Sequence, residues 1–266
     1  MPEGDTVHKL AARLHAELAG QSARSVDVPT RYGRQLSGQT LTGVDCRGKH
    51  LFIRFGNGLA VRVHLGLYGS WHRYAPGERW KKPARQARLV LCTDEALFVC
   101  FNAREVELLR GEGLAERDLA HRLGPDLLAP DVRTGEICAR ARRVADPETP
   151  LVDVLLDQRI AAGIGNVYKS EVLFLQGTDP FAVLGQVDDG RLAALFGCAA
   201  GLLGRNLGGG PRVTRPSGEG RDRLWVYDRA GRPCLRCGGV IQIARWGRGR
   251  RSTYWCAYCQ SPPAAS

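Results

Sequence analysis

Cys234-Leu235-Arg236-Cys237 and Cys256-Ala257-Tyr258-Cys259 are two Cys-x-x-Cys pairs separated by eighteen residues. This spacing is typical of a tetrahedral four-cysteine zinc site, with an iron–sulfur cluster or a redox role as the alternatives. All four ligand positions are cysteine, so none stays open for a catalytic water and we expect a structural metal. Between the pairs, 240–244 and 252–255 are predicted strands of a hairpin, and its basic tip, 245–251, predicts a DNA-probing finger.

The composition of the whole chain also indicates a nucleic-acid-binding protein. Its 266 residues are enough for two domains plus a small module, and 44% of them are hydrophobic. The formal net charge of +11 suits a polyanion, although a generally arginine-rich proteome is the alternative explanation. No run of about 18 apolar residues is present, so we expect no membrane-spanning helix.

The N-terminus and the cysteine count predict a cytoplasmic protein, and DNA binding would associate it with the nucleoid. The first residues lack an apolar segment and include Asp5 and Glu17, which is unlike a signal peptide. Nine cysteines, an odd number, argue for reduced thiols or metal rather than a disulfide framework. We expect the cysteines outside the two pairs to be buried small hydrophobic residues: Cys46, Cys92, Cys100, Cys138 and Cys198.

Residues 1–124 are expected to form a helix followed by a β-sandwich. Apolar residues recur at helical spacing from Val7 to Leu18, and Gly20 can end the helix. The apolar period then changes to two, with a hairpin turn predicted at 56–58. The predicted strands are 24–28, 41–46, 50–55, 59–65, 89–92, 96–101 and 106–109. Many short strands at regular spacing favour a sandwich or barrel.

Residues 125–225 are expected to form a helical domain, followed by the finger at 226–262. The predicted helices are 134–144, 149–157, 166–176 and 188–207. Thr149 is the expected cap before Pro150, and Asn166 is the expected cap of the next helix. The glycine-rich segment 208–223 is predicted to be a flexible loop.

The stretch from Ala161 to Glu171 is a candidate phosphate clamp. Its two glycines give a tight turn, and exposed backbone N–H groups at the turn and the following helix start can hold a phosphate. We therefore predict a helix–turn–helix variant in which Asn166 and Lys169 contact DNA. A plain helical hairpin with a glycine turn is the alternative.

Met1-Pro2-Glu3-Gly4-Asp5 is the candidate catalytic stretch. If Met1 is removed, Pro2 offers a secondary amine, and an α-amine has a reference pKa of about 7.7–8.0 against about 10.4 for lysine. More of it is therefore nucleophilic at neutral pH, and attack on an aldehyde-level carbon gives an iminium. Glu3 can move protons beside it. The alternative is that these residues only begin a helix, with proline and acids in its first turn.

A second candidate contact follows the strand predicted at 59–65. Leu67 and Tyr68 lie in a loop bracketed by Gly66 and Gly69. If this pair is exposed, it can enter a DNA stack from which a base has been removed. Ordinary core packing is the alternative.

Together these features resemble one family, the formamidopyrimidine-DNA glycosylase and endonuclease VIII family of base-excision repair enzymes. The resemblance covers nearly the whole chain. Its markers, in order, are 1–4 (Met-Pro-Glu-Gly), 47–49 (Arg-Gly-Lys), 122–126 (Arg-Leu-Gly-Pro-Asp), 163–166 (Gly-Ile-Gly-Asn) and the four-cysteine finger with 251–256 (Arg-Ser-Thr-Tyr-Trp-Cys).

The resemblance implies a bifunctional DNA glycosylase and AP lyase with catalytic residues from both ends of the chain. Pro2 would form a Schiff base at C1′ of the damaged nucleoside, with Glu3 as the acid and base. Lys49 would contact phosphate and assist β-elimination, and Arg251 would assist δ-elimination.

The resemblance also implies the architecture and the partner, which is damaged DNA. The fold would be α+β: an N-terminal helix with a β-sandwich, a helix–two-turn–helix domain and a zinc finger, with DNA between the two domains. Arg122 and Asn166 would contact phosphates, and one zinc ion would be structural. We expect a monomer, because a single cleft suffices.

Details of the sequence are similar to the endonuclease VIII branch, which prefers oxidised pyrimidines. Gly4 stands where the purine-specific branch typically has leucine, and 67–71 is Leu-Tyr-Gly-Ser-Trp. Asp5 and Gly66 depart from the pattern, and a glycine at 66 cannot fill the void left by a flipped base. A purine-type glycosylase is the alternative within the family. A non-catalytic DNA-damage-binding zinc protein is the alternative of another class.

Overall fold

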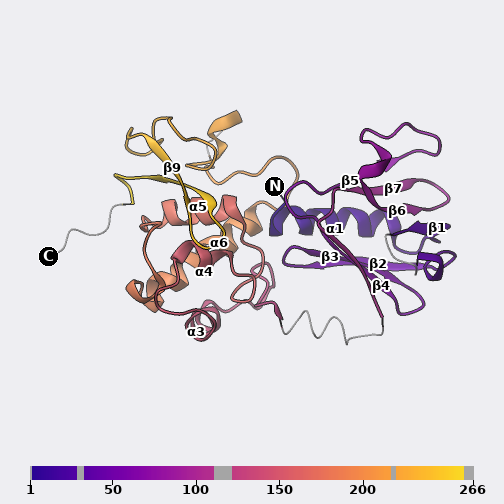
Figure 1. The fold of residues 1–266 in the computed structure, drawn as a ribbon, viewed down its shortest axis with the longest axis horizontal. Coiled ribbons are helices and arrows are strands. Elements are labelled where there is room, and N and C mark those ends of the chain that lie inside the picture. The colour runs from indigo at the N-terminus through magenta and orange to yellow at the C-terminus, as the bar shows by residue number, and fades with distance from the viewer. Residues whose placement is uncertain (1, 29–32, 111–121, 217–219, 261–266) are drawn as a thin grey trace. The chain divides into compact units, whose positions relative to one another are not determined.

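A computed structural model describes residues 2–28, 33–110, 122–216 and 220–260 of the chain. The chain divides into two units, residues 1–122 and 123–266 (Figure 1). Helices and strands occur in both units, which confirms the predicted α+β class. The predicted domain limits at 124 and 225 stay predictions. The removal of Met1, on which the secondary amine of Pro2 depends, concerns a residue outside the described ranges.

The described residues of unit 1 include helix α1 and two antiparallel sheets. Helix α1 covers Gly4–Leu18. The first sheet has the order β2-β3-β4-β8, with bounds Leu41–Arg47, His50–Phe55, Ala60–His64 and Glu105–Leu109. The second has the order β1-β6-β7-β5, with bounds Ser25–Asp27, Ala87–Cys92, Leu97–Phe101 and Ser70–Tyr74. The helix and every strand predicted in this region are confirmed.

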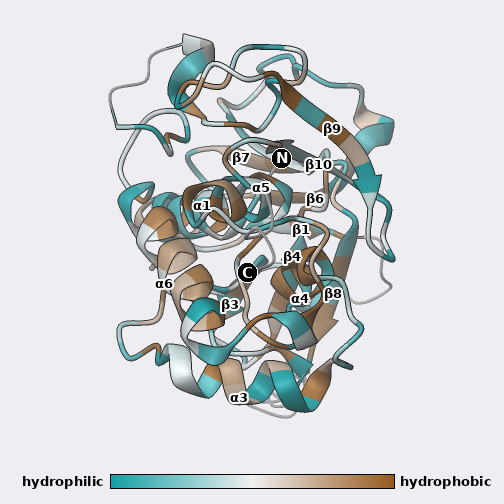
Figure 2. Ribbon diagram, turned by 90° about the vertical axis from the view of Figure 1, so that its left-hand side faces the viewer, coloured by the Kyte–Doolittle hydropathy of each residue, from teal (hydrophilic) through white to brown (hydrophobic). Residues whose placement is uncertain are grey.

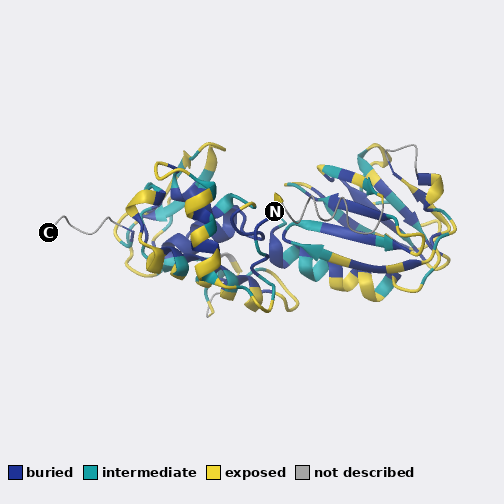
Figure 3. Cartoon of the chain, turned by 90° about the horizontal axis from the view of Figure 1, so that it is seen from below, coloured by how far each residue is buried: buried dark blue, intermediate teal, exposed yellow. Residues whose placement is uncertain are grey.

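The core of unit 1 lies between the helix and the inner faces of the two sheets. Helix α1 buries Val7, Ala11, Leu14 and Leu18, which recur at three- and four-residue spacing and form one face. This face packs in one cluster with inward residues of both sheets, such as Leu51 of β3. The buried segments of the strands are dark blue in Figure 3. The helix start is therefore fixed to a rigid body.

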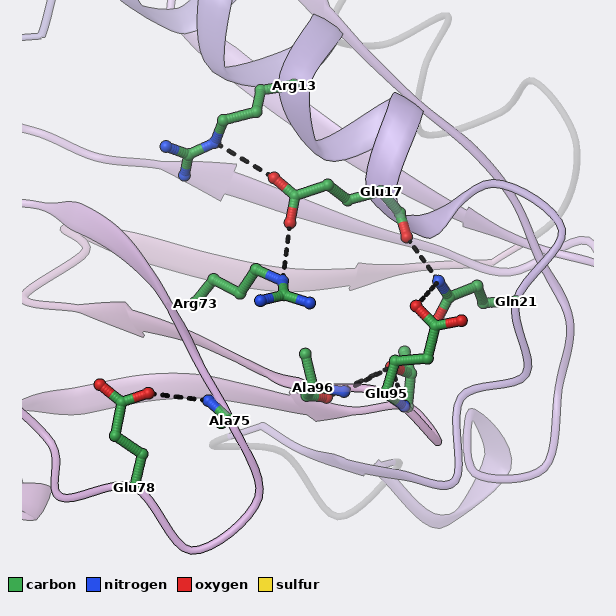
Figure 4. Close-up of polar contacts among 9 residues, drawn as sticks. Arg13, Glu17, Gln21, Arg73, Ala75, Glu78, Glu95 and Ala96 are labelled. Atoms are coloured by element: carbon green, nitrogen blue, oxygen red, sulfur yellow. Dashed lines mark hydrogen bonds and ion pairs between the residues drawn. The ribbon is translucent and has the colours of Figure 1, made fainter.

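The C-terminal end of α1 is tied to the second sheet by polar contacts (Figure 4). The carboxylate of Glu17 pairs with Arg73 of β5 at 3.1 Å and with Arg13 one helical turn earlier at 3.6 Å. Gln21 donates to the Glu17 carbonyl at 2.8 Å and to Glu95 at 3.3 Å. These contacts fix the direction of the helix relative to the strands.

Strand β5 was not predicted from the sequence. Its buried residues, Trp71 and Tyr74, are three apart, so the alternation that marks a half-buried strand is missing. Tyr74 lies on the outer face, where it stacks on Trp80 with ring centroids 6.2 Å apart. Its hydroxyl also accepts a hydrogen bond from the Lys81 backbone N–H at 3.0 Å. The segment that contains Trp80 and Lys81 thus covers the outer face of β5, which the sequence pattern does not predict to be buried.

The described residues of unit 2 include four α-helices and a two-stranded hairpin. The helices are α3, α4, α5 and α6, with bounds Thr134–Val144, Leu151–Leu156, Asn166–Leu175 and Asp189–Arg205. The hairpin pairs β9, Ile241–Trp246, with β10, Arg251–Cys256. Helix α6 carries a band of apolar residues, brown in Figure 2, which packs with α3, α4 and α5 in one core. These elements confirm the predicted helices and finger strands.

Two predicted helix caps are wrong by one position. Pro150 is itself the residue before α4, and the buried Thr149 hydroxyl makes no hydrogen bond among the described residues. Gly165 precedes α5, so Asn166 is the first helical residue. In both places the N-cap position is occupied by a neighbour of the residue with the suitable side chain: Pro150 instead of Thr149, and Gly165 instead of Asn166. The backbone of each neighbour is already extended, as an N-cap requires. Asp188 does cap α6, accepting from the Arg191 N–H at 2.7 Å.

No helix in the described ranges combines the length and apolar character needed to cross a membrane. Of the cysteines outside the finger, Cys100 and Cys138 are buried as expected, whereas Cys46, Cys92 and Cys198 are only partly buried. Burial raises the pKa of Cys100 to about 12.

Candidate functional site

Pro2 and Glu3 lie directly before the first turn of α1. Pro2 is half-buried and Glu3 is fully buried. Glu3 has extended backbone dihedrals, and its carbonyl accepts the first helical hydrogen bond, from Val7 at 3.0 Å. The candidate nucleophile is thus mounted on a helix whose apolar face is held in the core.

Lys49 lies in the two-residue turn between β2 and β3, which is closed by the pairing of Arg47 with His50. Gly48, the first turn residue, has a φ of +57°, a conformation that favours glycine. Lys49 itself is half-buried. A short hairpin turn of this kind holds the lysine close to the sheet.

The topology of unit 1 brings Pro2, Glu3 and Lys49 to the same end. The C-terminus of α1 meets the start of β2, where Gly20 donates to the Leu41 carbonyl at 2.8 Å. Fifteen helical residues span about 22 Å and seven strand residues about 23 Å, so the helix start lies level with the end of β2. The start of α1 and the Lys49 turn therefore lie at the same end of unit 1.

The loop with Leu67 and Tyr68 lies at this same end. It follows β4, whose last residue, His64, pairs with His50 beside the Lys49 turn. The Gly69 N–H donates to the Leu65 carbonyl at 3.0 Å, and a Cβ on Gly69 would lie 2.3 Å from that oxygen. The loop is thus a tight turn that needs glycine.

Its two large side chains point away from the core. Leu67 is 41% exposed and Tyr68 is 79% exposed. This excludes the alternative that the pair serves as core packing.

A buried polar group beside Lys49 was missed by the sequence reasoning. Arg62 of β4 is 7% exposed and pairs with Glu105 at 2.9 Å and with Glu107 at 2.8 Å, both on β8. It also contacts Nδ1 of His50 at 2.7 Å. Polar residues alternating along β3, β4 and β8 are the signal that could have shown this network on the outer face of the sheet.

His50 is held neutral in this network. Arginine can only donate, so Nδ1 of His50 must accept and the proton sits on Nε2. Burial, followed by the charges of His64, Arg62 and Lys49, lowers the pKa of His50 to about 3. Burial also lowers the pKa of His64, against the opposing charge of Glu105.

In unit 2, the predicted phosphate clamp is a turn ending at the start of α5. Gly163 has a φ of +121°, and its N–H donates to the side chain of Gln158 at 3.1 Å. Asn166 is 8% exposed, and its Nδ2 donates to the Ser252 carbonyl of β10 at 2.8 Å. The Asn166 amide is therefore used to join α5 to the finger.

The predicted DNA contact of Lys169 is wrong. Lys169 is fully buried, and its ammonium donates to Asn166 Oδ1, to the Ser252 carbonyl and to Thr253 Oγ1, at 2.8, 3.0 and 2.9 Å. A side chain whose donors are all used inside the protein has none left for a phosphate. Because α5 has 3.6 residues per turn, position 169 faces the interior and β10. The sequence motif alone does not show this orientation.

The four finger cysteines form a compact cluster. Their Sγ atoms all lie within 4.8 Å of one another. A tetrahedral zinc site with Zn–S bonds of about 2.3 Å places sulfurs about 3.8 Å apart. The separations of 3.9 Å between Cys234 and Cys259 and 3.4 Å between Cys237 and Cys256 agree with this geometry. The donor set therefore fits zinc.

The pKa values of these thiols are shifted by burial, by hydrogen bonds and by their proximity to one another. The Gly239 N–H, followed by the neighbouring thiols, lowers the pKa of Cys237 to about 7. Burial, followed by the neighbouring thiols, raises the pKa of Cys259. Burial is also the main cause that raises the pKa of Cys256. Four thiolates repel one another at this distance, so a bound cation is what lets all four ionise.

The two predicted arginines are both exposed. Arg251 begins β10 and pairs with Trp246 of β9. Arg122 adjoins residues outside the described ranges, at the junction of the two units.

The segment predicted to be a flexible loop, 208–223, is pinned at both ends. The buried Glu171 carboxylate accepts from Thr214 Oγ1 and from the N–H groups of Trp225, Val226 and Tyr227, the latter three at 2.8–2.9 Å. Asn206 holds Val213 through two bonds, at 2.7 and 2.8 Å. The sequence reasoning missed both anchors, whose partners are separated by up to 56 residues in the sequence.

Two family models match the chain. The formamidopyrimidine-DNA glycosylase N-terminal domain matches residues 1–106, and the formamidopyrimidine-DNA glycosylase H2TH domain matches residues 123–214.

Curated proteins match over almost their full length. The chain is 44% identical to probable endonuclease 8 2 of Streptomyces coelicolor, over 99% of this chain and 95% of that protein. It is 40% identical to DNA-(apurinic or apyrimidinic site) lyase Nei2 of Mycolicibacterium smegmatis, over 98% and 99%.

A solved structure shares the fold. Formamidopyrimidine-DNA glycosylase of Lactococcus lactis, bound to DNA containing an AP site, superposes with a TM-score of 0.83 at 23% identity, covering 98% of this chain and 100% of that one.

Proposed function

Because the chain belongs to the formamidopyrimidine-DNA glycosylase and endonuclease VIII family, we propose that it excises oxidised bases from DNA and then cuts the strand as an AP lyase. The observation that carries this proposal is the common location of Pro2, Glu3 and the Lys49 turn at one end of unit 1. A secondary amine, a carboxyl group and a cation together suit Schiff-base chemistry on a phosphodiester-linked sugar.

The proposed reaction begins with the amine of Pro2 after removal of Met1. Its nitrogen attacks C1′ as the bond from C1′ to the base breaks, and the base leaves with a proton. Glu3 supplies a proton to the sugar ring oxygen, which opens the ring and gives an iminium. The iminium withdraws electrons from the adjacent carbon, so a C2′ proton is lost and the C3′–O bond breaks. This releases the 3′ phosphate.

In a second elimination the C4′ proton is lost and the C5′–O bond breaks, which releases the 5′ phosphate, and water then hydrolyses the iminium to free Pro2. Lys49 is proposed to bind the phosphate beside the lesion and assist the first elimination. Arg251 is proposed to bind phosphate and assist the second. Both are cations that can neutralise charge on a departing phosphate.

DNA binding is proposed to use exposed groups from both units. Leu67 and Tyr68 would enter the stack after the damaged nucleotide is flipped out, and their exposure supports this role. Arg122 would contact a backbone phosphate. Asn166, nearly buried, would contribute mainly through the N–H groups at the start of α5.

We infer that the four cysteines hold one structural zinc ion. Zinc would supply the cross-link that the small finger core lacks, by joining Cys234 and Cys237 to the end of β10.

The lesion class is proposed to be oxidised pyrimidines. Support comes from Gly4, from the run 67–71, and from full-length relatives named as endonuclease 8 proteins. A purine lesion is the alternative, and the test below separates the two.

The test is borohydride trapping on three labelled duplexes, which carry 5-hydroxyuracil, 8-oxoguanine or an abasic site. The wild-type protein, with Met1 shown to be absent by mass spectrometry, is expected to give a covalent band that is strongest with 5-hydroxyuracil among the damaged bases. A stronger 8-oxoguanine lane would reverse the lesion assignment.

Pro2→Gly is expected to lose the trapped band and strand cutting by at least about 100-fold, because the secondary amine is gone. Binding to an abasic-site analogue, measured by fluorescence anisotropy, should change little. A Pro2→Gly protein that cuts DNA as fast as wild type would contradict the mechanism. If the wild-type protein binds the analogue but cuts no substrate, a non-catalytic damage-binding protein would be favoured.

A further inference from the structure

Lys169 is a charged side chain in the interior of unit 2. It is fully buried on α5, and its ammonium reaches three oxygen acceptors, as many as it has N–H donors. Burying an ammonium is costly unless it is fully hydrogen-bonded. The surroundings of Lys169 therefore form a built site for the ammonium rather than a chance contact.

The bonds of Lys169 join the start of α5 to strand β10. The carbonyl of Ser252 accepts from Lys169 at 3.0 Å and from Asn166 at 2.8 Å. Ser252 is the residue after Arg251, so two donors from α5 fix the backbone directly beside the exposed arginine. A third bond, to Thr253 Oγ1 at 2.9 Å, fixes the next residue.

Lys169 also sets the orientation of the Asn166 amide. Oδ1 of Asn166 accepts from the ammonium at 2.8 Å, and this leaves Nδ2 to donate to Ser252. Without the ammonium, Oδ1 loses this donor and the amide is free to turn. One buried charge thus fixes a residue at the helix start and a strand on the finger at once.

A second anchor holds the finger tip. The Arg248 N–H donates to the carboxylate of Asp153 on α4 at 2.7 Å. A Cβ on Gly247, whose φ is +76°, would lie 2.5 Å from the same carboxylate. Arg251 therefore lies between two attachments of the finger to the helices.

We propose that Lys169 is a positioning residue that holds Arg251 and the start of α5 in one arrangement for phosphate binding, and that it thereby controls the second elimination. This inference rests on the proposed function. Lys169 does not touch the DNA itself. Its loss should slow release of the 5′ phosphate, while attack by Pro2, which belongs to the other unit, should be largely kept.

The experiment compares Lys169→Met and Thr253→Val with wild type under single-turnover conditions on an abasic-site duplex labelled at the 5′ end. The product of the first elimination alone and the product of both eliminations differ in gel mobility. Lys81→Met, the same substitution at an exposed lysine in unit 1, is the matched control. Zinc content and thermal unfolding show whether each variant is folded.

Lys169→Met is expected to form the second-elimination product about tenfold more slowly, so that the first product accumulates. Its borohydride-trapped complex should form within about twofold of the wild-type rate. Thr253→Val should shift the same ratio by a smaller factor, and Lys81→Met should behave as wild type. If Lys169→Met loses its zinc, Thr253→Val decides the question.

Two results would overturn the inference. One is wild-type product ratios in both folded variants, and the other is an equal loss of trapping and second elimination, which would indicate a general defect. Hydrogen exchange of the β10 amides, expected to be faster in Lys169→Met, tests the anchoring without relying on activity. A wild-type protein that gives no trapped complex would instead overturn the proposed function, so the two failures are distinguishable.

Discussion

Burial, followed by the charges of His64 and Arg62, keeps His50, the residue after Lys49, neutral, and Arg62 fixes its tautomer. Arg62 is held by Glu105 and Glu107 and donates to Nδ1 of His50. A second imidazole, that of His64, lies 4.8 Å from His50 between ring centroids. Neutral imidazoles leave the lysine and the arginine as the cations at this end of the sheet, where a phosphate is proposed to bind.

This arrangement makes folding stability depend on pH. The pKa of His50 falls from 6.5 to about 3 on folding. Below pH 6.5 the unfolded chain therefore binds a proton that the folded protein does not, and stability falls as the pH is lowered toward 3. His50→Gln, which keeps an acceptor for Arg62, should flatten the slope of unfolding free energy against pH by up to about 1.4 kcal/mol per unit. Urea unfolding between pH 4 and 7 measures it, and equal slopes would contradict the assignment.

At the scale of elements, the finger hairpin has a small core, and we expect its folding to depend on the proposed zinc ion. Its buried cluster holds Phe174, Val226, Cys234, Ile241 and Cys256, and two of these are proposed zinc ligands. A core of this size contributes little stability by itself, so we expect it to need cross-linking by the proposed zinc ion. The attachments at Asp153 and Lys169 would then orient a hairpin stiffened by that ion.

Removal of zinc should therefore unfold the hairpin and spare unit 1. A strong chelator is expected to release one zinc ion per chain and to make residues 234–260 sensitive to protease. Exchange protection of the β2 and β3 amides, which belong to the core of unit 1, should be unchanged. Peptide mapping by mass spectrometry locates the cuts. Cleavage that is no faster after chelation would show that the hairpin does not depend on metal.

At the scale of the whole molecule, local patterns predicted most of the elements and few of the contacts between them. Period-two and period-3.6 patterns predicted α1 and most strands because one face of each is buried and the other is not. Strand β5 was not predicted because its outer face is covered by Trp80, which belongs to a separate segment. The sequence also did not predict the buried polar contacts of Lys169, His50 and Glu171. Their partners are distant in the sequence, and no local pattern encodes those pairings.

The net charge of the whole chain determines how its affinity for DNA should depend on salt. A net charge of +11 implies that binding to DNA releases many counterions, so affinity should fall steeply as salt rises from 50 to 200 mM. Arg122→Gln removes one exposed cation proposed to contact phosphate, and it should make the slope of log affinity against log salt about one unit shallower. Arg79→Gln, at an exposed arginine outside the proposed contacts, is the control. Anisotropy titrations on an abasic-site analogue measure both slopes. If the two variants share the wild-type slope, Arg122 makes no phosphate contact; if both flatten it equally, binding depends on total charge rather than on a defined site.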